Sequence, residues 1–137
     1  NATIVTTRRE IAADDYFQGM FATALEEGEI IKAIRFPAPK RAAYSKFHHP
    51  ASGYAMAGAF VAETSSGVRV AITGAGANGV FRWSEAEAAL AKKFDAAALD
   101  GLKIDDAQCL SDLHAGADYR AHLAAVMARR AVQKITG

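Results

Sequence analysis

The chain has 137 residues, of which 51% are hydrophobic and 23% charged, a composition typical of a globular protein that buries one hydrophobic core. Its 16 lysine and arginine residues nearly balance 15 acidic residues, which excludes the strong net charge by which proteins attract nucleic acid or an anionic membrane surface. No apolar run approaches the roughly 20 residues that a membrane-spanning helix needs, so we also expect no membrane insertion.

The cysteine content and the N-terminus predict the compartment. The single cysteine, Cys109, cannot form an intramolecular disulfide and is typical of a reducing compartment, where a lone thiol is usually a small buried hydrophobe. The first residues lack the charged-then-apolar pattern of a secretion signal. We therefore expect a cytoplasmic protein with a single domain over residues 1–137. Because the chain starts at Asn1 and not at methionine, we also expect it to be a piece of a longer polypeptide.

The first segment predicts a strand and a short helix. Residues 3–9 are typical of a strand that is already under way. Asp14 or Asp15 can then cap a helical turn that continues over residues 17–25 and ends near Gly28.

More strands are predicted up to the middle of the chain. In residues 29–36 the apolar residues Ile30, Ile34 and Phe36 fall on the same side of an extended chain, and prolines follow at positions 37 and 39. This pattern predicts a strand. Further strands are predicted over residues 42–48, 54–63 and 68–72. The last two are separated by the turn-forming residues Ser65-Ser66-Gly67, so we expect them to form an antiparallel hairpin.

The second half of the chain predicts helices. Ser84, with Glu87 three residues later, has the pattern of a capping box and begins a helix that runs to about Lys93. Asp118 can cap a final helix, in which apolar residues recur at helical spacing: Tyr119, Leu123, Val126, Met127 and Ile135. Strands followed by helices predict an α+β fold, an antiparallel sheet of three to four strands with about three helices packed on one face.

The glycine run Gly74-Ala75-Gly76-Ala77-Asn78-Gly79 matches the pattern G-x-G-x-x-G directly after a predicted strand. In a dinucleotide site the third glycine opens a helix whose N-terminus receives the pyrophosphate. Here Val80-Phe81-Arg82-Trp83 follow instead, and the predicted helix begins only at Ser84. We interpret the run as a turn, and a nucleotide-binding domain that uses Gly74–Gly79 is the weaker alternative.

Other catalytic patterns find little support. His48 and His49 point to opposite sides of an extended chain, and His114 and His122 have no cysteine or carboxylate at ligand spacing, so we expect no metal site. Adjacent carboxylate pairs are better explained as caps and solvated loops than as acid and base catalysts. Because the G-x-S-x-G pattern of a hydrolase is also missing, we assign no catalytic residue.

Lys46 and Tyr54 flank a segment with Pro50, Ser52 and Gly53, which predicts a loop between two strands. An exposed aromatic residue in such a loop suits stacking on a planar ring, whereas a tyrosine that begins a buried strand packs its ring into the core. From the residues alone we favour the packed ring for Tyr54. Lys46 is expected to be solvated, although its ammonium group could reach a carbonyl or phosphate of a ligand.

Several short motifs, in this order, resemble one known family. They are Asp15-Tyr16-Phe17-Gln18-Gly19, Gly28-Glu29-Ile30-Ile31, Lys46 to Tyr54, Thr73-Gly74-Ala75-Gly76, Ser111 to Ala115 and Tyr119 to Ala131. Together they cover nearly the whole chain and resemble the C-terminal domain of the flavin-binding (medium) subunit of molybdenum hydroxylases. Aerobic carbon monoxide dehydrogenase and xanthine dehydrogenase belong to this family.

The resemblance implies that the chain is part of an oxidoreductase subunit. In the family a molybdenum centre oxidises the substrate, iron–sulfur clusters relay the electrons, and FAD passes them to a final acceptor. The domain leans against the FAD-binding domain of the same subunit and helps to cover the flavin. Ile31 and Lys46 resemble positions that contact FAD, and Tyr54 resembles an aromatic residue that stacks near the flavin ring. The molybdenum cofactor and the iron–sulfur clusters belong to partner subunits.

One departure from the family pattern limits what this chain does alone. The glycine-rich FAD segments of the family lie upstream and have no counterpart in residues 1–137, and the cysteines of an iron–sulfur site are also missing. We therefore expect the chain alone to bind FAD weakly or not at all and to be inactive. The alternative is a non-catalytic docking or oligomerisation module, suggested by the apolar residues 54–63 and the amphipathic final helix.

Overall fold

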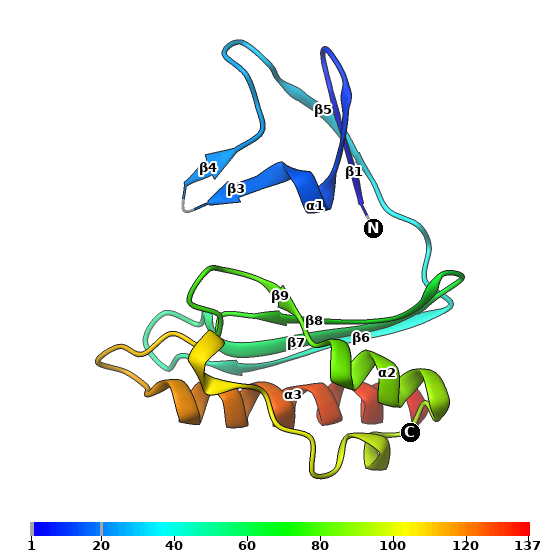
Figure 1. The fold of residues 1–137 in the computed structure, drawn as a ribbon, viewed down its shortest axis with the longest axis vertical. Helices are drawn as coiled ribbons and strands as arrows, with labels where there is room; N and C mark the ends of the chain where they lie inside the picture. Colours follow the sequence, from blue (N-terminus) through cyan, green and yellow to red (C-terminus); the bar gives the residue numbers. More distant parts are fainter. Residues whose placement is uncertain (1, 20) are drawn as a thin grey trace. The chain divides into compact units, whose positions relative to one another are not determined.

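The computed structural model describes residues 2–19 and 21–137. The chain separates into two compact units, residues 1–38 and residues 39–137, and each is described by itself (Figure 1). The single domain over residues 1–137 stays a prediction.

The first unit is built on a three-stranded antiparallel sheet. Strand β1 (Thr3–Thr6) lies between β2 (Glu10–Ala12) and β5 (Ile31–Arg35). Ile4 pairs with Ile11 on β2, and with Tyr16 these two residues form the small buried core of the unit. The strands expected at the start of the chain and before the prolines are therefore confirmed.

The helix expected to continue over residues 17–25 is wrong. Helix α1 (Ala13–Tyr16) has a single turn, and β3 (Phe17–Gly19) and β4 (Ala22–Thr23) follow it as an antiparallel pair. Phe21 has a φ of 60°, a left-handed conformation that reverses the chain between the two strands. Neither Asp14 nor Asp15 is the N-cap, because both lie in the first turn of α1.

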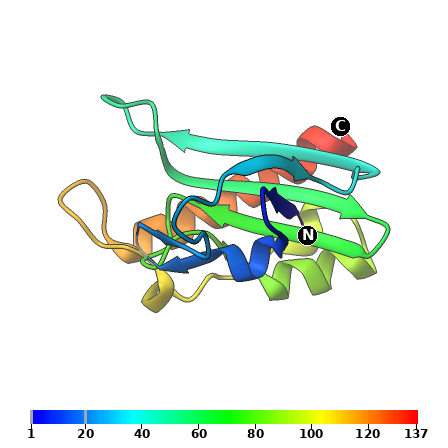
Figure 2. The same cartoon turned by 90° about the horizontal axis from the view of Figure 1, so that it is seen from above.

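The second unit contains a four-stranded antiparallel sheet. Its strands follow the order β6 (Arg41–His48), β7 (Ala55–Thr64), β8 (Gly67–Thr73) and β9 (Phe81–Arg82). Figure 2 shows the long strands side by side with helix α3 behind them. The predicted strands are confirmed, and the predicted hairpin is the β7–β8 pair, in which Thr64 lies opposite Gly67.

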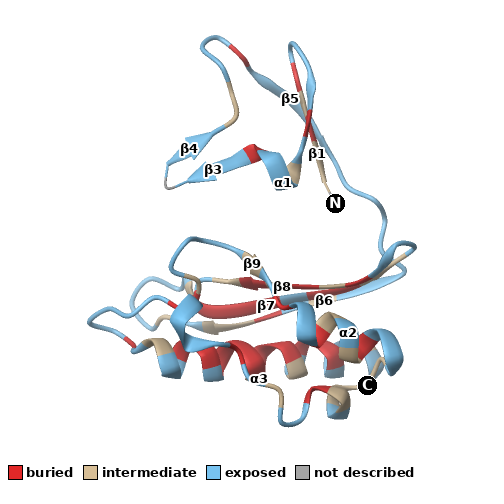
Figure 3. Cartoon of the chain, in the orientation of Figure 1, coloured by how far each residue is buried: buried red, intermediate tan, exposed pale blue. Residues whose placement is uncertain are grey.

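Helices cover one face of this sheet. Helix α3 (Ala117–Thr136) lies along β6 and β7, and α2 (Ser84–Lys92) lies against β8 (Figure 1). Two short 3-10 helices, η1 (Ala96–Leu99) and η2 (Asp106–Gln108), lie between them in the chain. Buried residues concentrate where sheet and helices meet (Figure 3). The largest fully buried side chains there are Ile72, Leu90, Leu99, Met127, Val61, Val70 and Val132. The predicted α+β fold is confirmed.

Neither predicted helix cap forms. The N-cap of α2 is Trp83, and the carboxylate of Glu87 does not bond back to the start of the helix. Instead it accepts the backbone N–H of Val70 at 3.0 Å and the Nε–H of Arg82 at 2.8 Å, so it joins α2 to β8 and β9. Helix α3 begins after Gly116, two residues earlier than a cap at Asp118 requires.

Strand β6 lies at the edge of the four-stranded sheet. Near the end of α3, Lys134 donates from Nζ to the backbone carbonyl of Tyr44 on this strand, at 3.0 Å. On the sheet face away from the helices, the Tyr44 hydroxyl reaches across Gly58 to within 2.9 Å of Thr73 Oγ1. None of the described helices has the length and apolar character needed to cross a membrane.

Candidate functional site

Lys46 and Tyr54 meet at the loop between β6 and β7. Lys46 lies on β6, and its Nζ donates to the carbonyl of Gly53 at 3.0 Å. Gly53 has a φ of 71°, a conformation that glycine adopts readily and that turns the chain back toward the sheet. The ammonium group has two further protons available for a ligand after this hydrogen bond.

The ring of Tyr54 lies in solvent, since the residue is 79% exposed. The expectation that Tyr54 packs into the core is wrong, because β7 begins one residue later, at Ala55. Tyr54 is still held by its backbone: its N–H donates to Ser52 Oγ at 3.3 Å, and its carbonyl accepts the N–H of His49 at 2.7 Å. An exposed aromatic ring on a fixed backbone, at a loop to which an ammonium group bonds, can stack on a planar ligand that carries acceptors.

Ile31 belongs to the other unit. It is the first residue of β5, is paired with Thr6 on β1, and is 39% exposed. The structure therefore places Lys46 and Tyr54 at the same β6–β7 loop, where Lys46 bonds to the residue before Tyr54, and it describes Ile31 only within the first unit.

Arg120 supports this region from the buried side, and sequence reasoning gave it no role of its own. It is 4% exposed, and its Nη1 donates to the carbonyls of Met56, at 2.7 Å, and Gly74, at 3.2 Å. Its Nη2 donates to Asp112 Oδ2 at 2.8 Å. A signal was present, because Arg120 falls at helical spacing with the buried residues Leu123 and Met127.

Asp112 organises the segment before α3. The carboxylate accepts the backbone N–H groups of His114 and Ala115, at 2.9 and 3.1 Å, and the guanidinium of Arg120. These bonds, the His114 amide first and then Arg120, lower the pKa of Asp112 to about 2. At neutral pH the buried Arg120 therefore faces a charged partner.

The glycine run forms a turn, as predicted. Gly74 has a φ of 72°, and a Cβ there would lie 2.2 Å from the carbonyl oxygen of Ala55. The run is followed by β9 and not by a helix, so the helix N-terminus of a dinucleotide site is missing. The hollow beside Gly76 and Gly79 measures about 210 Å³, below the roughly 300 Å³ of small ligand pockets. This geometry disfavours the nucleotide-binding alternative.

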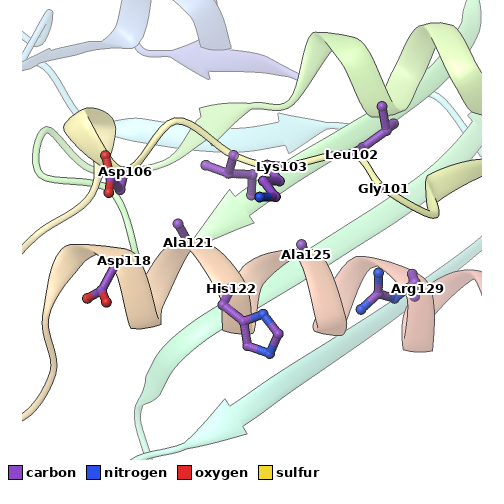
Figure 4. Close-up of a pocket in the computed structure, with 10 residues that line it drawn as sticks. Gly101, Leu102, Lys103, Asp106, Asp118, Ala121, His122, Ala125 and Arg129 are labelled. Carbon is purple, nitrogen blue, oxygen red and sulfur yellow. The ribbon is translucent and has the colours of Figure 1, made fainter.

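A larger hollow, about 460 Å³, lies between α3 and the segment over residues 101–106 (Figure 4). It holds none of Ile31, Lys46 and Tyr54. Its charged lining is mixed: Lys103, His122 and Arg129 against Asp106 and Asp118.

Other reactive groups have structural explanations. Among residues 2–19 and 21–137, no three His, Cys, Asp or Glu side chains gather as metal ligands. Cys109 is a free, buried thiol, as predicted, and burial raises its pKa, with Asp106 adding to the effect. In the first unit Glu29 is 7% exposed and accepts hydrogen bonds from Thr6 and Arg9 at 2.6 to 3.1 Å, which lower its pKa to about 2.

The second unit coincides with a known domain. Residues 40–135 match the family described as the CO dehydrogenase flavoprotein C-terminal domain. The chain belongs to this family. The resemblance inferred from the motifs is thereby confirmed, with the family match beginning at residue 40, just after the first unit ends at residue 38.

The relatives that match are longer chains, of which this chain covers about half. The carbon monoxide dehydrogenase medium chain of Afipia carboxidovorans is 38% identical over 140 residues, which cover 92% of this chain and 48% of the relative. The nicotine 6-hydroxylase medium subunit of Paenarthrobacter nicotinovorans is 33% identical, with 93% and 48% covered. The chain thus spans about half the length of the curated relatives that it matches.

Solved structures agree with this family. The reconstituted CO dehydrogenase from Oligotropha carboxidovorans superposes with a TM-score of 0.80 at 34% identity, over 98% of this chain and 52% of that chain. The quinoline 2-oxidoreductase from Pseudomonas putida 86 gives a TM-score of 0.69 at 22% identity over the same shares, a likeness of fold alone.

Proposed function

We propose that this chain covers the flavin in the FAD subunit of a molybdenum hydroxylase, with Tyr54, Lys46 and Ile31 next to the cofactor. The observation that carries the proposal is the exposed ring of Tyr54, directly after the Gly53 carbonyl to which the Lys46 ammonium group donates. Nothing in the fold requires a 79% exposed tyrosine at this loop, and exposed aromatic residues beside a charge are typical of binding surfaces.

FAD, when bound in the intact subunit, accepts electrons that come from iron–sulfur clusters in a partner subunit and passes them to an acceptor. The role of this chain is to bind and shield. Tyr54 would stack on the flavin and limit the access of water and acceptors. Lys46 would donate a hydrogen bond to a flavin oxygen, and Ile31 would add an apolar contact.

The residues present suit a planar ring with oxygen acceptors, but they supply no phosphate cradle. Among the described helices, α3 starts at Ala117, and its first turn carries Asp118, whose charge opposes a pyrophosphate. We therefore propose that the phosphates are held by the FAD-binding domain of the same subunit, and that this chain alone binds FAD weakly and is inactive.

The surface of the first unit supports docking to that FAD-binding domain. Phe17, Ile34 and Phe36 are 76%, 50% and 73% exposed, and among residues 2–19 and 21–38 the buried core is the small cluster of Ile4, Ile11 and Tyr16. Several large exposed apolar side chains on one small unit are typical of an interface. Relatives of about twice this length contain further residues that can pack against such a surface. The molybdenum and iron–sulfur subunits are the further proposed partners.

A titration of FAD into the 137-residue chain, followed by NMR, tests the flavin proposal. Weak binding is detectable at millimolar FAD, and we expect shifts centred on Tyr54, Lys46 and the loop between them. Tyr54→Phe keeps the stacking ring and should bind like the parent chain. Tyr54→Leu removes the ring and should weaken binding by roughly tenfold, since stacking on an aromatic side chain contributes about 1–3 kcal/mol per base.

Lysine variants supply the matched control. Lys46→Met should weaken binding, whereas Lys92→Met, on the exposed side of α2, should not change it. Equal binding by the parent chain and Tyr54→Leu, or shifts confined to another surface, would contradict the proposed flavin contact.

A further inference from the structure

In the loop that carries Tyr54, His49 makes four of the hydrogen bonds, beside those of Lys46 to Gly53 and of Tyr54 to Ser52. The backbone N–H of His49 donates to the carbonyl of Tyr54 at 2.7 Å, and its carbonyl accepts the N–H of Gly53 at 2.9 Å. The side chain adds two bonds, because its Nδ1 accepts the N–H of Ala51 at 3.2 Å and the N–H of Ser52 at 3.3 Å. His49 thus bonds to every residue from 51 to 54.

The two side-chain bonds fix the protonation state of the ring. A nitrogen that accepts hydrogen bonds carries no proton, so Nδ1 is bare and the proton of the neutral imidazole is on Nε2. In an imidazolium both nitrogens carry protons, and Nδ1–H would then point at the N–H groups of Ala51 and Ser52. The loop in this form therefore requires a neutral His49.

The titratable and charged groups around His49 are His114, His48, Lys46 and the Asp112–Arg120 pair. The His49 and His114 rings meet edge to face, with centroids 4.6 Å apart and planes at 80°. On β6 the neighbouring groups are His48 and the Lys46 ammonium, which is bonded to Gly53 in the same loop. Behind His114, the charge of Asp112 is compensated by Arg120 of α3.

We propose that His49 is a positioning residue for Tyr54: its neutral imidazole holds the loop over residues 49–54 in the form that presents the exposed Tyr54 ring. A proton on Nδ1 in acid would release the Ala51 and Ser52 amides and let the ring move. The link between this loop and flavin binding rests on the proposed function, whereas the effect of His49 on the loop itself does not.

Two substitutions in the 137-residue chain separate the acceptor from the ring. In His49→Asn the side-chain oxygen takes the place of Nδ1, accepts the same amides as in an Asx turn, and does not titrate. In His49→Phe a ring of similar shape remains against His114, but the acceptor is lost. His114→Gln, which keeps His49 and removes the neighbouring titration, is the control for the source of any pH effect.

Amide hydrogen exchange and chemical shifts of Ala51, Ser52 and Tyr54, followed by NMR from pH 8 to pH 5, read out the loop. We expect protection of the two amides to fall by roughly tenfold or more on acidification in the parent chain and in His114→Gln, as for the loss of two modest hydrogen bonds. His49→Asn should keep protection at every pH, and His49→Phe should lack it at every pH.

Two results would overturn the proposal. One is protection of Ala51 and Ser52 in His49→Phe, and the other is a pH transition of the loop that persists in His49→Asn. Repeating the FAD titration at pH 8 and pH 5 then tests the flavin link separately. A loop transition without flavin shifts at Tyr54 at either pH would leave His49 as the positioning residue and contradict the proposed function.

Discussion

Nη2 of Arg120 lies 2.8 Å from Oδ2 of Asp112, while Nη1 of the same guanidinium donates to the carbonyls of Met56 and Gly74. One buried side chain of α3 therefore joins the segment before the helix, the start of β7 and the glycine turn. Because Met56 follows Tyr54 by two residues, Arg120 also fixes the strand from which the proposed flavin loop extends.

Arg120→Met should destabilise the second unit by roughly 2–4 kcal/mol, since it leaves two carbonyls and a carboxylate without their buried donor. Arg120→Lys keeps the charge but loses the paired N–H donors of the guanidinium, so its stability should lie between those of the parent chain and Arg120→Met. Urea unfolding followed by the fluorescence of Trp83, the single tryptophan, measures both changes. A stability of Arg120→Met within 0.5 kcal/mol of the parent chain, roughly the error of such a measurement, would contradict this role.

Gly74 and Gly53 form a matched pair that separates the steric clash of an added side chain from the cost of a left-handed backbone. Their φ angles are 72° and 71°, but a Cβ at Gly74 would lie 2.2 Å from the Ala55 carbonyl, whereas a Cβ at Gly53 meets nothing within 4 Å. Gly53→Ala should cost about 1 kcal/mol of stability, the strain of a left-handed alanine, and Gly74→Ala should cost clearly more. Thermal unfolding compares the two, and equal losses would show that the close approach at Gly74 is easily relieved.

Leu90 of α2 tests whether that helix is part of the main core. The side chain is 1% exposed, so Leu90→Ala should reduce the free energy of unfolding by about 2–5 kcal/mol. Leu113→Ala removes the same atoms from a residue that is 90% exposed and should change it by less than about 0.5 kcal/mol. Urea unfolding gives both values, and a small effect at Leu90 would mean that α2 separates from the sheet before the unit unfolds.

Glu29 should make the first unit lose folding stability at low pH. Hydrogen bonds from Arg9 and Thr6 lower the pKa of Glu29 from its ordinary value of 4.5 to about 2. Its carboxylate therefore stabilises the folded unit above pH 4.5, and this contribution is lost as the pH falls toward 2, where the unfolded chain binds the extra proton first. NMR signals of the Ile4 and Ile11 methyl groups report the folded fraction during the titration.

Glu29→Gln is the test of that loss, because the amide does not take up this proton. Its stability should depend less on pH in this range than that of the parent chain, and it should be lower at pH 7. Glu27→Gln, at an exposed neighbouring position, serves as the control. An unchanged pH dependence in Glu29→Gln would assign the loss of stability at low pH to other groups.

Periodicity predicted much of the second unit, because β8 buries alternate residues, β7 is a long apolar run and the last helix buries one face. Local signals failed where a distant partner competed for the same group. Glu87 has the spacing of a capping box, but the N–H of Val70 and the guanidinium of Arg82 bind its carboxylate. Residues 17–25 favour a helix locally, yet Phe21 reverses the chain and pairs β3 with β4.

The proposed site was predicted in part. Lys46 and Tyr54 came from the family resemblance, while physical reasoning from the residues placed the Tyr54 ring in the core as the start of a buried strand. That strand begins at Ala55, and Tyr54 belongs to the exposed loop before it. Arg120 and His49 act through backbone carbonyls and amides of distant or looping residues. Such partners have no sequence signature, since every residue carries the same backbone groups.

The contact between Lys134 and the Tyr44 carbonyl bears on solubility. Strand β6 is eight residues long and lies at the edge of its sheet, the kind of strand that can recruit a strand from another molecule. A lysine bonded to that backbone places a charge where an incoming strand would have to dock. The last helix thus disfavours pairing of the β6 edge with a strand of another molecule, in addition to covering the core.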